Sequence, residues 1–216
     1  MRRMIKQSVL SLLSFLPTPG HPSLVGPGAH LRWRAGWLRG WAYRPYWRLR
    51  AAMGGTRLVI GARFSLQGRL RVSGPGTVIF GDDVIVDALC TPFTHSRQAV
   101  IRIGSRSFVN GTRLGCSQLI QIGSDCILAD ARIMDTDFHA VHRARNLPGM
   151  TPLEAPVRIG NNVWIAAGAA VLKGVEIGDD CVIAFGSVVT HSVSAGRIAG
   201  GNPARDLAAV PEAEIS

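Results

Sequence analysis

Three side chains in the segment MDTDFHAVHRAR, residues 134–145, have the types and spacing needed for acid–base chemistry. His139 follows Asp137 by two residues and Asp135 by four. An imidazole titrates near neutrality, so it is suited to accept the proton of a hydroxyl group as that hydroxyl attacks a carbonyl carbon. A carboxylate of Asp135 or Asp137 would then fix the tautomer through the other ring nitrogen. The alternatives are a surface histidine without a role and two solvated acids at a corner.

The elements that must position these residues are predicted by a six-residue repeat of aliphatic side chains. Six residues fit neither the 3.6-residue period of a helix nor the alternation of a plain strand. The period fits a coil of short strands and tight corners, in which each hexapeptide forms one side of a triangular turn and stacked turns enclose a core. The predicted inward positions are Ile60, Leu66, Val72, Val78, Phe80, Val86, Ile103, Val109, Ile122, Leu128, Met134, Ile159, Ile165, Val171, Ile177, Ile183 and Val189.

A second inward position is expected four residues after each aliphatic one, because side chains alternate along a strand. Small residues are common there, and Cys90, Cys126 and Cys181 occupy it. We expect these cysteines to fill space in the core and not to act as nucleophiles. Four cysteines without paired spacing also argue against a disulfide framework or a zinc knuckle.

The repeat breaks after Met134. Counting in sixes from Met134 predicts that Phe138 points into the coil and that His139 and the two acids before it point outward. The next aliphatic residue of the six-residue repeat comes too late for a corner. We therefore expect a loop of about residues 140–157 to project beside the coil. His139 would lie at the root of this loop.

The pattern [LIV]-G-x4, the segment PVRIGNNVWIAAGAAVLKGVEIGDDCVIAFGSVVT and the terminal GNPA resemble the hexapeptide-repeat acyltransferases. The most similar branch is the sugar O-acetyltransferases, which include galactoside and maltose acetyltransferases and enzymes that acetylate exopolysaccharide and lipopolysaccharide sugars. The resemblance implies an all-β fold, a left-handed parallel β-helix, a homotrimer with sites between subunits, and acetyl-CoA as co-substrate. In that family a histidine just before such a loop is the general base, and His139 occupies that position.

The resemblance also implies residues that bind the acceptor. FVNGT at residues 108–112 is similar to a family motif in which an asparagine holds the acceptor sugar, which makes Asn110 the candidate. Asparagine is equally a good corner residue. His142 and Arg143, at the start of the loop, are grouped with Asn110 as acceptor-binding candidates.

The cofactor site is implied in the same way. VWIAAG at residues 163–168 is similar to the stretch whose backbone amide contacts the oxyanion and whose tryptophan lines the acyl-CoA groove. Two departures concern this groove: Phe185 stands where the family usually has a small residue, and His191 replaces the usual lysine. Arg205 aligns with a basic residue that meets a CoA phosphate. The implied cofactor-binding set is Trp164, Ala166, Ala167 through its amide, Ala184, Phe185, Thr190, His191 and Arg205.

Residues 1–55 lie outside the repeat. The net charge of +10 is concentrated toward the N-terminus, because residues 1–81 hold 13 Lys and Arg and no Asp or Glu. Trp33, Trp37 and Trp41 are four apart, which predicts one stripe on a helix that Pro45 ends. The stripe fits a cap over the open end of the coil, or peripheral contact with an anionic membrane through residues 1–50. Nucleic acid is not an expected partner.

We therefore predict an N-terminal extension of residues 1–55, an acyltransferase coil of residues 56–207 and a C-terminal tail of residues 208–216. No apolar run approaches the ~20 residues that span a bilayer. No small-x-small cleavage site follows the basic and apolar residues 1–16. A cytoplasmic protein is expected, associated with membrane if the extension binds lipid.

The predicted function is acetyl-CoA-dependent O-acetylation of a bacterial saccharide, without a metal. One alternative is N-acetylation of an amino sugar, nucleotide sugar or antibiotic. Another is an inactive β-helix scaffold. A third is a zinc enzyme resembling the γ-class carbonic anhydrases, for which His139 and His142 have no matching third histidine.

Overall fold

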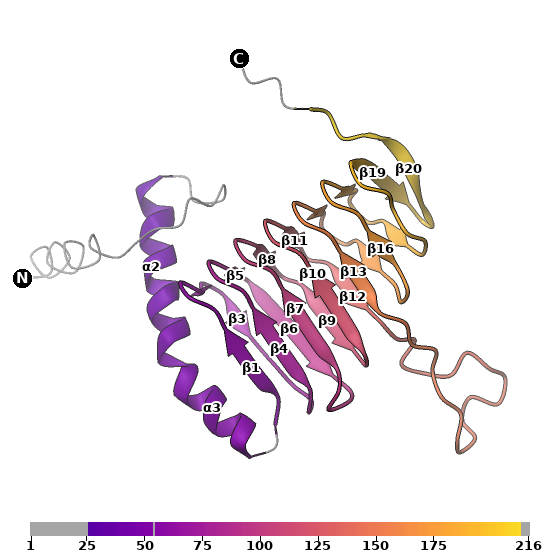
Figure 1. The fold of residues 1–216 in the computed structure, drawn as a ribbon, viewed down its shortest axis with the longest axis horizontal. Coiled ribbons are helices and arrows are strands. Elements are labelled where there is room, and N and C mark those ends of the chain that lie inside the picture. Colours follow the sequence, from indigo (N-terminus) through magenta and orange to yellow (C-terminus); the bar gives the residue numbers. More distant parts are fainter. Residues whose placement is uncertain (1–25, 54, 213–216) are drawn as a thin grey trace, which may run out of the picture.

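The computed structural model describes residues 26–53 and 55–212, which form a parallel β-solenoid with two helices at one end (Figure 1). Up to β19, strands that follow one another in sequence belong to different sheets, and each strand pairs with strands of the neighbouring turns. The predicted coil of stacked three-sided turns is confirmed.

Three sheets form the sides of the solenoid. The first contains β1 (Arg57–Ile60), β4 (Thr77–Phe80), β7 (Val100–Ile103), β10 (Leu119–Ile122), β13 (Val157–Ile159) and β16 (Glu176–Ile177). The second contains β2 (Ser65–Leu66), β5 (Ile85–Asp87), β8 (Phe108–Asn110), β11 (Ile127–Ala129), β14 (Trp164–Ile165), β17 (Val182–Ile183), β19 (Arg197–Gly201) and β20 (Ala204–Ala209). The third contains β3 (Arg69–Leu70), β6 (Leu89–Thr94), β9 (Arg113–Cys116), β12 (Arg132–Met134), β15 (Ala170–Val171) and β18 (Val188–Val189). The paired strands are parallel, except that β20 runs antiparallel to β19.

The core is a stack of aliphatic side chains in register. Inside the second sheet, Leu128 pairs in register with Val109 on one side and with Ile165 on the other. All three are fully buried. Each such burial contributes about 1.5–3 kcal/mol to folding. The predicted inward aliphatics from Ile159 to Val189 are confirmed, and all four cysteines are free and buried, as expected for three of them.

Corners between the first and second sheets are tight enough to require special residues. A Cβ atom on Gly123 would lie 2.4 Å from the carbonyl oxygen of Gly160 in the next turn, so only glycine fits. Two residues later, Asp125 has a φ of 62°, a left-handed conformation that aspartate tolerates. Its carboxylate binds Arg106 of the preceding turn at 2.6 Å, which ties the stacked corners together.

The predicted inward position of Met134 is wrong. Ile133 is the fully buried residue and pairs in register with Leu114 and Val171, whereas Met134 is half-buried. The cause is a corner with one residue fewer: five residues separate Leu128 from Ile133, while six separate the corresponding residues of the later turn. Because side chains alternate along a strand, this shift reverses which of the following residues point inward.

The helices α2 (Pro27–Ala42) and α3 (Arg44–Ala52) cap the solenoid at its N-terminal end, with α2 against β2 and α3 against β1 (Figure 1). The hydroxyl of Ser65 donates a hydrogen bond to the carbonyl oxygen of Trp33 at 2.8 Å. A Cβ atom on Gly40 would lie 2.9 Å from the ring of Phe64, so α2 approaches the coil closely. The cap, one of the two predicted roles of the tryptophan-rich segment, is present.

The predicted single tryptophan stripe is wrong. Trp33 is buried, Trp37 is half-buried and Trp41 is 63% exposed, because each step of four residues turns about 40° around a helix axis. Pro45 follows the end of this helix, which is at Ala42, as predicted. It lies in the first turn of α3, where proline is favoured because its missing N–H has no partner to lose. Among the described helices, none is long and apolar enough to cross a membrane.

Candidate active site

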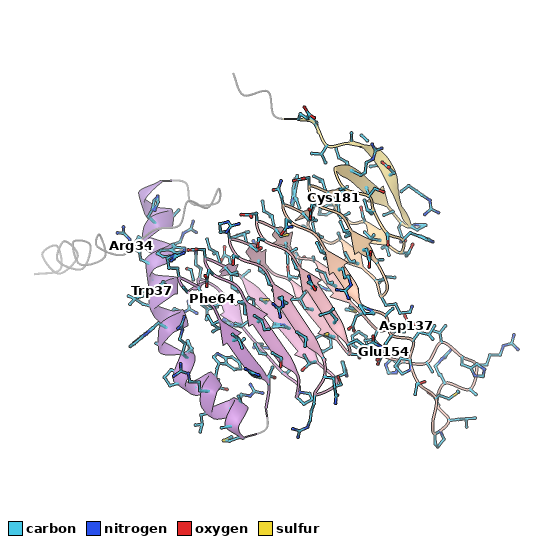
Figure 2. All side chains as sticks on the ribbon, in the orientation of Figure 1. Arg34, Trp37, Phe64, Asp137, Glu154 and Cys181 are labelled. Carbon is cyan, nitrogen blue, oxygen red and sulfur yellow. The ribbon has the colours of Figure 1, made fainter. Side chains whose placement is uncertain are left out.

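The chain leaves the solenoid after β12 and returns at β13, and the segment between them projects beside the coil (Figure 1). Its root is closed by an antiparallel bridge between Thr136 and Glu154. The amide of Asp137 also donates to the carbonyl oxygen of Leu153 at 3.1 Å. Figure 2 shows Asp137 and Glu154 at this root. The predicted protruding loop is confirmed, with His139 just beyond its root.

Asp135 does not point outward as predicted but is fully buried. The shortened corner before β12 places it on the inward side of the chain. There its carboxylate accepts three backbone N–H bonds, from one buried and two partly buried donors that would otherwise be unpaired. These bonds direct the carboxylate toward the preceding turn, so Asp135 does not orient His139. The donors are the amides of Ser117, Gln118 and Leu119, at 2.7, 2.7 and 2.8 Å.

Asp137 forms an ion pair with Lys173, whose Nζ lies 2.7 Å from Oδ1 of Asp137. The other carboxylate oxygen, Oδ2, is buried and has no hydrogen-bond partner among the described residues. Asp137 therefore keeps a free acceptor two residues before His139. Sequence reasoning missed Lys173. The signal was available, since Lys173 and Lys6 are the only lysines in an arginine-rich chain.

Phe138 does not point into the core as predicted. It has a φ of 59° and its ring stacks on Phe93 with centroids 5.6 Å apart. His95 lies against the same ring at 4.9 Å. Gly115 makes room for this cluster, because a Cβ atom there would lie 2.6 Å from Phe138 and 2.5 Å from Phe93. The left-handed turn at Phe138 anchors its ring on the third sheet and sets the path of the next residue, His139.

His139 is exposed, and neither of its ring nitrogens has a hydrogen-bond partner among the described residues. His142 and Arg143 are also exposed and lie three and four residues further along the same loop. Nδ1 of His142 accepts a hydrogen bond from the amide of Ala144 at 3.1 Å, which leaves Nε2 open. The loop thus carries two histidines and an arginine on its accessible surface.

A second group of predicted residues follows the corner between the second and third sheets. Asn110 ends β8, and its carbonyl oxygen accepts a hydrogen bond from the amide of Asp130 in the next turn at 2.6 Å. The carbonyl oxygen of Asp130 accepts from Gly168 at 3.3 Å, and that of Ala167 accepts from Gly186 at 3.0 Å. These corners therefore stack in one column. The candidates that it brings together are Asn110, Ala166, Ala167, Ala184 and Phe185.

Two large aromatic side chains project near this column. Trp164 is 48% exposed and precedes the buried Ile165, so it points outward as predicted, and Phe185 is 79% exposed. The N–H of Ala167 has no acceptor among the described residues. This combination offers apolar surface beside an unused hydrogen-bond donor.

The remaining cofactor candidates lie toward the C-terminal end. The hydroxyl of Thr190 and Nδ1 of His191 are 2.9 Å apart. Arg205 is exposed at the start of β20, and its guanidinium donates to the carbonyl oxygen of Ala204 at 3.3 Å. No carboxylate among the described residues pairs with Arg205. Its charge is free to meet an anion.

One chain does not bring the two groups together. Asn110 lies where the side formed by the third sheet begins. The ring of Phe138, the residue before His139, lies over Gly115, near the end of that side. From Asn110 the chain turns a corner and follows β9 to Gly115, a path of about 17 Å at 3.3 Å per residue. Within the described residues, no three His, Cys, Asp or Glu side chains gather as metal ligands would.

Burial excludes the cysteines from this chemistry. Desolvation raises the pKa of the Cys90 thiol to about 12 and that of Cys126 to about 11. Desolvation also raises the pKa of Cys116, helped by the neighbouring charge of Asp135, and that of Cys181. A thiol that stays protonated is a poor nucleophile, so the expectation that the cysteines fill the core stands.

The sequence matches the family model of the bacterial transferase hexapeptide, six repeats, over residues 156–191. It is 31% identical to the galactoside O-acetyltransferase of Escherichia coli over 115 residues, which is 53% of this chain and 56% of that protein. The chain spans 39–56% of the length of the first curated relatives that it matches.

Two solved structures share the fold at low sequence identity. A polysialic acid O-acetyltransferase aligns over 74% of this chain and 80% of its own, with a TM-score of 0.60 and 22% identity. A hexapeptide-repeat acetyltransferase of Vibrio cholerae, solved in complex with acetyl-CoA, aligns over 87% of this chain and 92% of its own, with a TM-score of 0.54 and 19% identity. These similarities show the solenoid fold.

Proposed function

We propose that this chain is a hexapeptide-repeat β-helix acetyltransferase and that it transfers the acetyl group of acetyl-CoA to a hydroxyl group of a bacterial saccharide. The observation that carries the proposal is His139, an accessible imidazole with both ring nitrogens unpaired among the described residues, held at the root of a projecting loop.

In the proposed reaction the acceptor hydroxyl attacks the thioester carbonyl carbon while His139 accepts its proton. A saccharide hydroxyl is far more basic than imidazole, so proton transfer accompanies C–O bond formation and does not precede it. The tetrahedral intermediate then collapses with cleavage of the C–S bond. CoA leaves as the thiol after taking the proton from the imidazolium, and the acetyl ester remains on the sugar.

The developing oxyanion needs hydrogen-bond donors, and we assign this role to the backbone N–H of Ala167. That donor is unused among the described residues, and the left-handed turn at Gly168, with a φ of 72°, follows directly. A fixed backbone donor needs no reorganisation as negative charge develops, which is why such donors contribute strongly to acyl transfer.

We further propose that the active site forms between subunits of a homotrimer. The path of about 17 Å along one side between Asn110 and the His139 region is too long for a single acceptor hydroxyl to meet both groups. A second copy must bring one group beside the other. The loop supports this assembly, since Val141, Leu147 and Leu153 are apolar and exposed in the single chain.

The acceptor and CoA would occupy the two groups of residues. Asn110, His142 and Arg143 are assigned to the acceptor, because amide, imidazole and guanidinium groups all hydrogen-bond sugar hydroxyls. Trp164, Phe185 and the corner alanines are assigned to the pantetheine arm. Thr190, His191 and Arg205 are assigned to the phosphate end. Asp137 is assigned to position His139 through its free Oδ2.

The test compares His139→Ala with His30→Ala, which removes a histidine from α2 at the far end of the molecule. With acetyl-CoA and a panel of glycans, thiol release and product mass are measured. We expect His139→Ala to lower kcat by about 10²–10⁴-fold with little change in acetyl-CoA binding. His30→Ala should behave as the unchanged protein does.

Near-normal turnover in His139→Ala would refute the assignment of the base. The products also separate the acceptor classes. An acetyl ester is cleaved by mild alkali or hydroxylamine, whereas an acetamide survives both, and a stable product would show N-acetylation instead.

A further inference from the structure

We propose that the N-terminal cap docks on an anionic membrane surface and that lipid phosphates enter a pocket between the helices and β3. This proposal is independent of acetyl transfer, since none of its residues belongs to the candidate active site.

The pocket lies where α2 and α3 meet the first turn of the solenoid and has a volume of about 530 Å³. Its apolar lining is formed by Leu66, Leu70 and Val72, which are the end of the core. Aromatic side chains line it from the helix side, namely Tyr43, Tyr46 and Trp47. Figure 2 shows α2 lying across this end of the coil. Such a pocket suits a group with an apolar part and a charged part.

The charged part must be an anion, because four arginines also line the pocket. Arg39 donates to the carbonyl oxygens of Gln67 and Gly68 at 3.1 and 2.7 Å, which fixes one wall. Arg50 donates to the carbonyl oxygen of Val72 at 3.2 Å, and its guanidinium lies 5.6 Å from the ring centre of Trp47. Both arginines are paired only with neutral groups, so their positive charges are not neutralised.

Arg69 and Arg71, on and just after β3, are exposed, and their guanidinium groups have no hydrogen-bond or ion-pair partner among the described residues. The sequence offers no local counter-ion either, since the first acidic residue is Asp82. Guanidinium groups match phosphate oxygens in pairs, so a phosphate ester is the ligand that this arrangement fits.

The outer faces of the helices indicate where the phosphate comes from. On α2, Leu31 and Leu38 are seven residues apart and exposed, on the side opposite the buried Trp33. On α3, Leu49 is exposed in the same way, on the side opposite the buried Trp47. Trp41 and Met53 extend this apolar surface, and no described residue covers it.

An apolar surface beside unneutralised arginines fits a lipid interface better than the other candidates. Apolar side chains enter the boundary between headgroups and acyl chains, while arginines reach the phosphates. A second copy of this cap would bring like charges together. A nucleic acid would bind the arginines but would leave the aliphatic side chains in water.

The experiment is co-sedimentation of the full chain with vesicles of phosphatidylcholine alone or with 30% phosphatidylglycerol. We expect binding to the anionic vesicles only, weakened by salt. Arg69→Ala/Arg71→Ala should weaken binding on the order of thirtyfold, as expected for two arginines at an anionic surface. Arg97→Ala/Arg102→Ala, which removes two exposed and unpaired arginines elsewhere, should not.

The apolar contribution has a closely matched control. Trp41→Ser/Leu49→Ser removes side chains that are 63% and 62% exposed, and Leu207→Ser removes a side chain of β20, far from the cap and from the loop, that is 62% exposed. Only the Trp41/Leu49 pair should reduce vesicle binding, by at least tenfold. Melting curves check that each variant is folded, and Arg69→Lys/Arg71→Lys should recover much of the binding.

The proposal is overturned if the pure phosphatidylcholine vesicles bind equally well. It is also overturned if the cap variants bind as the unchanged protein does, because the contact would then lie elsewhere in the chain. A third contrary result is specific binding of inorganic pyrophosphate or a short RNA that does not compete with vesicles. That result would assign the arginines to a soluble ligand.

Discussion

The two turns directly before the loop and the turns after it follow the same plan with one difference in length. After the loop, six residues lead from Ile165 in the second sheet to Val171 in the third. Before it, five residues lead from Val109 to Leu114 and from Leu128 to Ile133. The shorter corner leaves the stacking in register, because Ile133 still pairs with both Leu114 and Val171.

The difference teaches that stacking, and not the count of residues, determines which side chains enter the core. In the later turns the stacking and the count of residues agree, so the six-residue period alone predicts which side chains are buried. In the turn that leads into the loop, one missing residue moves Met134 out of the core and Ile133 into it. The same shift converts Asp135 from a predicted surface acid into a buried acceptor for the corner of the preceding turn.

The largest expected effect on stability comes from Asp135→Ala. The change leaves three backbone N–H groups, one buried and two partly buried, without an acceptor, which should lower the free energy of unfolding by about 4 kcal/mol. The matched change after the loop is Asp179→Ala, whose carboxylate accepts from the amide of Asn161 at an exposed corner. It should cost about 1 kcal/mol. Urea unfolding measures both, and equal losses would contradict the buried role of Asp135.

The register itself is tested by two pairs of neighbours. Ile133→Ala should lower the free energy of unfolding by about 3 kcal/mol, because it opens a cavity in the core. Met134→Ala should cost about 1 kcal/mol or less, since that side chain is half-buried. After the loop, Val171→Ala should likewise cost more than Leu172→Ala. A larger loss for Met134→Ala than for Ile133→Ala would mean that the six-residue count holds on both sides of the loop.

The smallest expected effect concerns alkaline pH. Burial raises the pKa of Cys90 to about 12, while a thiol in the unfolded chain titrates near 8.5. The unfolded state therefore loses the thiol proton first as the pH rises. The contribution of the protonated Cys90 thiol to the free energy of unfolding is complete below about pH 8.5 and declines as the pH rises toward 12. At one pH unit above the unfolded value the loss is about 1.4 kcal/mol.

Unfolding at pH 8 and at pH 9.5, compared with Cys90→Ala, measures this contribution of the thiol. The variant should show a shallower decline with pH. An identical decline in both proteins would mean that Cys90 ionises without unfolding. Cys181, after the loop, also has a raised pKa but is less deeply desolvated than Cys90, so Cys181→Ala should change the slope less.

The fold was accessible from the sequence because the core repeats. Each inward aliphatic side chain stacks on equivalent side chains of the neighbouring turns, so a single irregular residue does not hide the repeat. The small inward residues, including Cys126 and Ser187, followed from strand alternation in the same way. The helical cap was only partly accessible, since the packing of Gly36 and Gly40 against the coil determines which tryptophan is buried.

The site was less accessible because its geometry depends on contacts between distant residues. Lys173 meets Asp137 only because the turn after β15 stacks beside the loop root, which no local spacing records. Phe138 leaves the core because Gly115, from the preceding turn, offers it space on the third sheet. The outward position of Trp164, by contrast, followed directly from its place before Ile165 on a two-residue strand.

The antiparallel hairpin of β19 and β20 has a consequence for how these molecules meet end to end. A repeating parallel coil is a template on which another coil can add turns indefinitely and grow into a fibre. Here the first, second and third sheets terminate in β16, β20 and β18, at different heights, and the last strand of the second runs in the reverse direction. An incoming coil finds no flat, three-sided platform, and α2 covers the opposite end. Both routes to filament growth are thereby closed, and association is directed to the flanks of the prism.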